Sequence, residues 1–163
     1  MGMRPIVLKV ELFANGSETE RQYSQTCLQW ILECLVNCNR AYLRAHPHTP
    51  RIYESGVRYT HEDTTEDWEG IPSIIRHGGG DCEDLGGWRT AELRESGEPA
   101  KPYLKYREVD GFWHYHIQVQ RMHKDEHGNW IPGVIEDPSA LLGMGTMHEG
   151  KPISKFRMVK SLA

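Results

Sequence analysis

A cysteine at the predicted start of a helix is the clearest candidate nucleophile in this sequence. Cys82 follows three consecutive glycines, and a helical pattern begins at or just after it and runs to about Glu95. The first turn of a helix presents unpaired N–H groups and the positive end of the helix dipole, which lower a thiol pKa and stabilise an oxyanion. Glycines also let a backbone approach a ligand closely. The alternative interpretation is a buried structural cysteine after a flexible loop.

Two histidines on one predicted strand are the candidate bases for this thiol. Side chains alternate between the faces of a strand, so residues 112–121 put Trp113, Tyr115, Ile117 and Val119 on one face and His114, His116, Gln118 and Gln120 on the other. A catalytic thiol needs an imidazole within reach. Both histidines satisfy that pattern, and the alternative is an edge strand whose polar face meets water.

A carboxylate that could orient the imidazole follows the next apolar run. Asp137 ends the run Val134-Ile135-Glu136, and Pro138 fixes the chain as it leaves the strand. We therefore expect Asp137 at a rigid strand end beside the histidine strand. The alternative is an ordinary Asp-Pro turn.

The elements that must position these residues are helices first and strands afterwards. Ser17 and Glu20 have capping-box spacing and open a long helix at about 18–45, which Pro47 and Pro50 stop. A short helix starts at Ile71-Pro72, and Gly86 and Gly87 indicate that the next helix packs tightly on a sheet. The predicted strands are 6–12, 103–109, 112–121, 133–137 and 155–159, with Asp110-Gly111 as a hairpin turn. This order predicts one α+β domain over residues 1–163.

Three further cysteines lie in the long predicted helix. Cys27, Cys34 and Cys38 share an apolar stripe with Tyr23 and Trp30. Because cysteine behaves as a small hydrophobic residue and the stripe has no acidic or histidine partner, we expect free, buried core thiols and not a metal site.

The composition excludes several classes of protein. The formal charge of −4 over 163 residues argues against a dedicated nucleic-acid binder. No apolar run is long enough for a membrane helix, and the first ten residues lack the apolar core of a signal peptide. We therefore expect a cytoplasmic protein without disulfides. No calcium-loop pattern is present, so no cofactor is predicted.

The motifs Gly80-Asp81-Cys82-Glu83-Asp84-Leu85, His116-Ile117-Gln118-Val119 and Glu136-Asp137-Pro138-Ser139 together resemble the transglutaminase-like superfamily. Its members carry a G-x-C-x-[DE] segment, a histidine on a following strand and an aspartate in a D-P-[ST] turn. The closer resemblance is to short transglutaminase-like proteins of tailed phages and prophages, over about residues 53–144.

The resemblance implies a papain-like core in which a nucleophile helix packs on an antiparallel sheet. It implies Cys82 as nucleophile, His116 as base, with His114 as the alternative, and Asp137 as the orienting acid. Trp68 and Asp81 would line the site. The implied chemistry is thioester formation from a carboxamide or peptide bond in a peptide, protein or peptidoglycan-like substrate, in a bacterial host cytoplasm or a virion. Phage structural proteins are implied partners.

Two other functions compete with the enzyme. One is a catalytically silent, virion-associated or binding module that keeps the fold without the chemistry. The other is a zinc site built from Cys82, His114 and His116, because His-x-His on a strand is a metal-ligand spacing.

Overall fold

The computed structural model describes residues 17–61, 67–109 and 112–145. Its first element is the long helix α1 (Glu18–Ala45), with the bounds that the sequence predicts. The Ser17 backbone N–H donates to Glu20 Oε2 at 2.6 Å, and the Glu20 N–H donates to Ser17 Oγ at 3.4 Å. This capping box satisfies two N–H groups that the helix leaves free, so the helix begins where it does.

The predicted orientation of α1 is wrong. The buried residues are Ser24, Leu28, Leu32, Val36 and Asn39, whereas Cys34 and Cys38 are exposed and Cys27 is half-buried. All three thiols are free, as predicted, but they do not belong to the core. The helix carries two apolar stripes, and the one that meets the rest of the domain repeats every four residues from Ser24 to Val36. Periodicity finds both stripes and does not choose between them.

A short helix and a pair of two-residue strands lead to the candidate nucleophile. After η1 (Ile52–Glu54), β1 (Arg58–Tyr59) pairs in parallel with β2 (Gly79–Gly80). The helix α2 (Ile71–His77) ends at Gly78, whose φ of 81° is left-handed. A Cβ on Gly79 would lie 2.7 Å from the Arg58 carbonyl oxygen. Gly78 therefore ends α2, and Gly79 lets β1 approach β2 closely.

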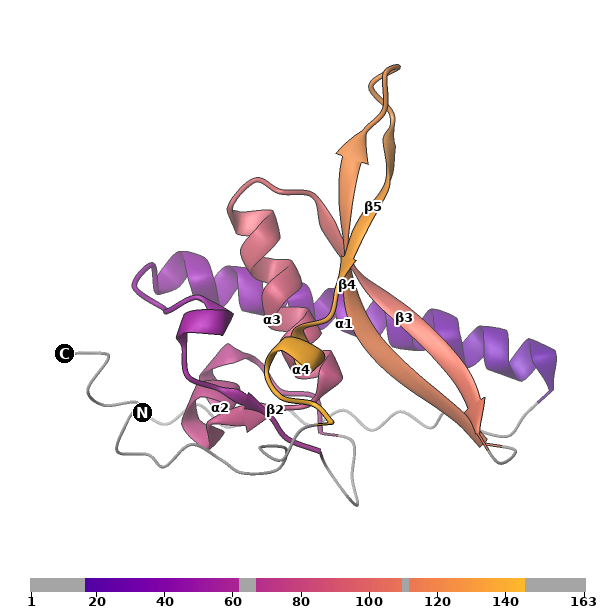
Figure 1. Cartoon of the computed structure of the whole chain (residues 1–163), viewed down its shortest axis with the longest axis horizontal. Coiled ribbons are helices and arrows are strands. Elements are labelled where there is room, and N and C mark those ends of the chain that lie inside the picture. The colour runs from indigo at the N-terminus through magenta and orange to yellow at the C-terminus, as the bar shows by residue number, and fades with distance from the viewer. Residues whose placement is uncertain (1–16, 62–66, 110–111, 146–163) are drawn as a thin grey trace.

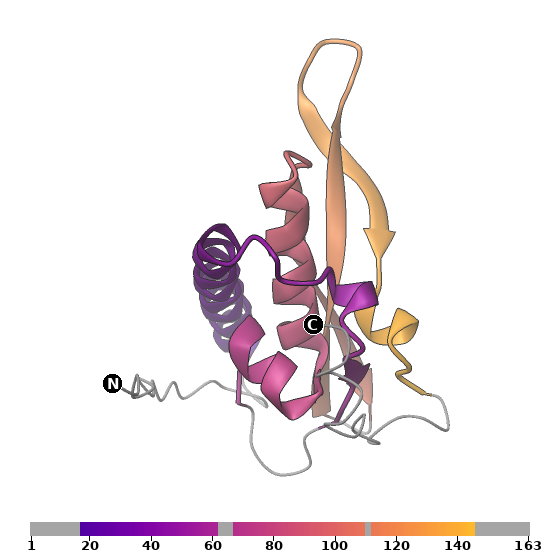
Figure 2. The same cartoon turned by 90° about the vertical axis from the view of Figure 1, so that its left-hand side faces the viewer.

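The helix α3 (Cys82–Glu95) occupies the centre of the molecule, and every residue from Cys82 to Leu93 is buried. Figure 2 shows α3 between α1 on one side and the sheet on the other. A Cβ on Gly86 would lie 2.8 Å from Ile117 Cγ2, and one on Gly87 would lie 3.1 Å from Leu35 Cδ2. The prediction that this helix is buried tightly against a sheet is confirmed, because both glycines face packed neighbours.

The sheet is antiparallel and has the order β3 (Ala100–Val109), β4 (Phe112–Lys124), β5 (Trp130–Glu136). The register of the first hairpin pairs Val109 with Phe112, as the Asp110-Gly111 signal predicts. Both β4 and β5 extend beyond the predicted strands 112–121 and 133–137, and together they form a second hairpin that projects from the body (Figure 1). The described part of the chain is thus mixed α+β, as expected. The predicted strands at 6–12 and 155–159 lie outside it.

The largest apolar cluster lies under α2, α3 and the end of the described chain. Its members are Ile52, Val57, Tyr59, Ile71, Ile74, Leu85, Trp88 and Leu142. Within the described residues, no helix is long and apolar enough to cross a membrane.

Candidate active site

The thiol of Cys82 sits at the first residue of α3 and is 9% exposed. Its Sγ donates to Glu83 Oε2 at 3.0 Å. Burial raises the pKa of the Cys82 thiol far above its ordinary value, and the charge and hydrogen bond of Glu83 raise that pKa further. The backbone N–H of Ile117 opposes this by hydrogen bonding to the sulfur. In this arrangement the sulfur is a protonated thiol.

A half-apolar environment surrounds the thiol. Cys82 clusters with Leu32 and Ile117, and Trp68 and Tyr115 pack against the cluster. The Tyr115 hydroxyl donates to Glu83 Oε1 at 3.3 Å, so strand β4 fixes the carboxylate that holds the thiol. Trp68 therefore lies beside the thiol, and its role in lining a catalytic site stays a prediction.

The loop that carries Trp68 is tied to the start of α3 through Asp84. The Glu69 N–H donates to Asp84 Oδ1 at 2.6 Å, and the Asp81 N–H donates to Asp84 Oδ2 at 3.3 Å. Burial and the charge of Asp81 raise the pKa of Asp84, while these two N–H groups oppose the rise. Asp81 is itself buried at the helix cap. One carboxylate thus holds both predicted site-lining residues in place.

The imidazole of His116 is hydrogen-bonded to the predicted aspartate. His116 Nε2 lies 2.8 Å from Asp137 Oδ2, and Gln118 Nε2 donates to the same oxygen at 3.0 Å. Asp137 also caps the short helix α4 (Pro138–Leu141), where Oδ1 accepts from the Ala140 N–H at 3.2 Å. Burial alone would raise the pKa of Asp137, but these hydrogen bonds lower it to about 2. The carboxylate is therefore ionised at neutral pH.

The two histidines are in different surroundings. His116 is half-buried against Asp137, whereas His114 is exposed at the far end of the same strand face. The pair His116–Asp137 is therefore the one that the fold assembles, and the catalytic roles of both residues remain predictions.

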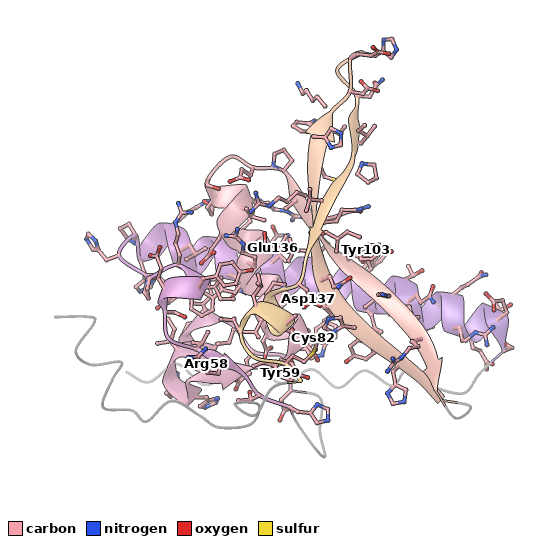
Figure 3. All side chains as sticks on the ribbon, viewed as in Figure 1. Arg58, Tyr59, Cys82, Tyr103, Glu136 and Asp137 are labelled. Atoms are coloured by element: carbon pink, nitrogen blue, oxygen red, sulfur yellow. The ribbon has the colours of Figure 1, made fainter. Side chains whose placement is uncertain are left out.

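The structure does not join the thiol to either imidazole. Within the described residues, no hydrogen bond links Cys82 to His114 or His116, and the thiol instead meets Glu83 and the Ile117 backbone. Ile117 directly follows His116, so the sulfur contacts the strand one residue away from the candidate base. Figure 3 shows Cys82 and Asp137 in the same region, where α3 begins and β5 ends.

A partly buried ion network fixes the end of β5 immediately before Asp137. Arg89 Nε on α3 donates to Glu136 Oε1 at 2.6 Å, and Arg121 on β4 donates to Oε2 at 3.0 Å. The Tyr53 hydroxyl also donates to Glu136. Burial works to raise the pKa of Glu136, but these donors hold it below its ordinary value. Helix α3 thus positions both Cys82 and, through Glu136, the aspartate.

Sequence reasoning missed two residues of this site. Glu83 was visible only as part of a motif, and nothing in its spacing indicates that it binds the thiol. Gln118 could have been found, because it lies two residues after His116 on the same strand face and so points toward the same carboxylate.

The zinc hypothesis has no geometric support. Among the described residues, no group of three His, Cys, Asp or Glu side chains is placed to hold a metal ion. The three side chains that the hypothesis requires are not gathered.

No protein-family model, no curated protein and no solved structure matches this chain at a significant level.

Proposed function

We propose that this protein is a transglutaminase-like cysteine enzyme with a papain-like core, in which Cys82 attacks a carboxamide or peptide carbonyl. The observation that carries the proposal is the contact of Asp137 with His116 and Gln118 on β4. Ile117, which lies between these two residues, contacts the sulfur of Cys82. A histidine oriented by a carboxylate beside a thiol at a helix start is the arrangement that nucleophilic catalysis needs.

The proposed reaction begins with proton transfer from the thiol to His116. Asp137 holds Nε2, so Nδ1 is the ring nitrogen that remains to take the proton. The sulfur then forms a bond to the carbonyl carbon, and the N–H groups of the first turn of α3 stabilise the oxyanion. The imidazolium returns its proton to the departing ammonia or amine as the C–N bond breaks, and a thioester remains.

Water or an amine then resolves the thioester. Water gives hydrolysis or deamidation, and an amine gives acyl transfer, while His116 removes a proton from the incoming nucleophile and returns it to the sulfur. The proposed substrates are peptides, proteins or peptidoglycan-like molecules, in a bacterial host cytoplasm or a phage particle.

In the proposed scheme, Glu83 holds the thiol in an unreactive state. The hydrogen bond to Glu83 keeps the thiol protonated, so catalysis requires the thiol to leave Glu83 and turn to His116. Substrate that neutralises or displaces the Glu83 carboxylate would favour that movement.

The same contact favours the second candidate, a binding module without catalysis. A buried thiol with a raised pKa beside a carboxylate is typical of an unreactive cysteine. In that case the His116–Asp137 pair would serve only to fix strand β4 against α4.

An assay of turnover separates the two candidates. A glutamine-rich protein is incubated with a fluorescent primary amine, and amine incorporation, ammonia release and peptide cleavage are followed together. The enzyme predicts at least one of these products, lost in Cys82→Ala and retained in the exposed-thiol control Cys34→Ala. Absence of all three products with this substrate, together with failure of a peptide-amide library to acylate Cys82, would favour the binding module.

A further inference from the structure

The outer side of α1 carries a continuous line of residues at alternating spacings of three and four. We call this line the outer seam, and it consists of Glu20, Tyr23, Cys27, Trp30, Cys34, Asn37, Ala41 and Arg44. This is the heptad spacing of coiled coils, in which two helices pack by knobs-into-holes contacts. In Figure 2 the other side of α1 faces α3, so the seam points away from the domain.

The outer seam is exposed and carries charge only at its two ends. Trp30 is 72% exposed and Tyr23 is 59% exposed. In the middle of the helix the charged residues turn inward, where Glu33 binds Arg94 at 2.7 Å and Arg40 binds Glu95 at 2.6 Å. Glu18 and Arg21, near the helix start, pair with each other. A line of exposed aromatic and thiol side chains over several helical turns is typical of an interaction surface.

The distribution of side-chain size indicates which partner fits. The two large aromatic residues, Tyr23 and Trp30, lie in the N-terminal half of the seam, and the C-terminal half holds Cys34 and Ala41 and no aromatic residue. If a second copy of α1 packs antiparallel, with Tyr23 opposite Ala41, then Trp30 falls opposite Cys34. Each large side chain thereby meets a small one, and the interface can pack closely.

The end charges agree with the same register. It places Glu20 of one copy opposite Arg44 of the other, at both ends of the pair. Arg44 is 61% exposed and shares Glu95 with Arg40, so it has room to face a second carboxylate. A parallel pair would instead set Glu20 on Glu20, Arg44 on Arg44 and Trp30 on Trp30, with like charges opposed.

We propose that the chain forms a twofold dimer in which the outer seams of two α1 helices pack antiparallel. Size and charge are complementary about one common centre, between Trp30 and Cys34. That self-complementarity is what a twofold interface requires. This self-complementarity favours a second copy of α1 as the partner that covers the outer seam. The two other candidates are residues 1–16 of the same chain and a helix of another protein.

Sedimentation equilibrium of the full chain under reducing conditions, over a micromolar concentration range, tests the dimer. We expect Trp30→Glu to raise the dissociation constant about 30-fold or more, the effect of losing a central interface tryptophan. The matched control is Trp130→Glu, because Trp130 is 52% exposed but lies on the β4–β5 hairpin against Lys124. It should leave the constant unchanged.

An exchange of side chains tests the antiparallel register. Trp30→Cys puts two small residues together, and Cys34→Trp puts two large ones together, so each should weaken the dimer. The double variant restores one large and one small residue at each contact and should recover the affinity to within about threefold. Circular dichroism confirms that each variant keeps its helix. A monomeric wild type, an unaffected Trp30→Glu variant, or a double variant weaker than both single variants would each overturn the proposal.

Discussion

His116 Nε2 lies 2.8 Å from Asp137 Oδ2, and this contact joins the middle of β4 to the residue that directly follows β5. Because Asp137 also caps α4 and accepts from Gln118, its carboxylate is held from three sides. The imidazole is therefore held by its Nε2 atom, and Nδ1 is available to a thiol or a substrate. Asp137 thus contacts the imidazole of His116 and caps α4 with the same side chain.

Replacement of Asp137 should change the acid stability of the protein. The pKa of this carboxylate is about 2 in the folded protein and about 3.9 in an unfolded chain. Because the pKa is lower in the folded protein, the ionised carboxylate stabilises the fold at pH values above the pKa of the unfolded chain. This stabilisation is lost as the pH falls toward about 2. We expect Asp137→Asn to be less stable than wild type at pH 7, with the difference shrinking between pH 4 and pH 2.

Urea denaturation at several pH values measures this difference. Glu126→Gln is a suitable control, because the Glu126 side chain is 86% exposed on the turn between β4 and β5. A difference between Asp137→Asn and wild type that stays constant from pH 7 to pH 2 would show that the His116 and Gln118 contacts do not stabilise the ionised form.

Replacement of Glu83 should release the thiol. Glu83→Gln removes the negative charge beside Cys82 but keeps a side chain of the same shape, so the pKa of Cys82 should fall. We expect faster alkylation of Cys82 by iodoacetamide at pH 8, resolved by peptide mass spectrometry, with the exposed Cys38 as an internal reference.

The matched control is Glu126→Gln, whose side chain is 86% exposed on the β4–β5 turn. It should leave the ratio of the Cys82 and Cys38 rates unchanged. If the ratio of these two rates in Glu83→Gln is equal to or lower than in wild type, burial alone sets the reactivity of Cys82, and Glu83 does not restrain it.

A methyl group at Gly86 should destabilise the fold. Gly→Ala in an exposed helix stabilises by about 1 kcal/mol, but a Cβ on Gly86 would lie 2.8 Å from Ile117 Cγ2. We expect Gly86→Ala to lower the free energy of unfolding by about 1–3 kcal/mol, as overpacking does. Gly87→Ala meets the movable tip of Leu35 at 3.1 Å and should have a smaller effect. Thermal denaturation measures both, and a stabilised Gly86→Ala would contradict the close packing of α3 on β4.

The parts of the fold that the sequence predicts well are those with strong local signals. The capping box at Ser17 and the prolines after residue 45 fix α1, and Asp110-Gly111 fixes the first hairpin. Gly86 and Gly87 indicate close packing correctly, because a helix tolerates two adjacent glycines chiefly where something else occupies the space of a side chain.

The parts that the sequence predicts badly depend on tertiary contacts. Contact with α3 determines which face of α1 is buried. The two apolar stripes of α1 cannot be told apart from the sequence of the helix alone. The glycines before Cys82 are interpreted from the sequence as allowing the close approach of a ligand. In the structure Gly78 ends α2, and Gly79 allows β1 to approach closely. The carboxylate of Glu83 that contacts Cys82 is held by Tyr115, which lies on β4 and is distant in the sequence.

The central claim, that Cys82 acts with the His116–Asp137 pair, is tested most directly by the pH dependence of Cys82 alkylation. The rate is measured from pH 5 to pH 9 in Glu83→Gln, which releases the thiol, and in its double variants with His116→Ala and with His114→Ala, relative to the exposed Cys38 in the same chain. If a thiolate–imidazolium pair forms, His116→Ala should slow alkylation at pH 6 by about tenfold or more and raise the apparent pKa, whereas His114→Ala should leave both unchanged. Identical profiles in all three proteins would contradict the claim, and an effect confined to His114→Ala would move the base to His114.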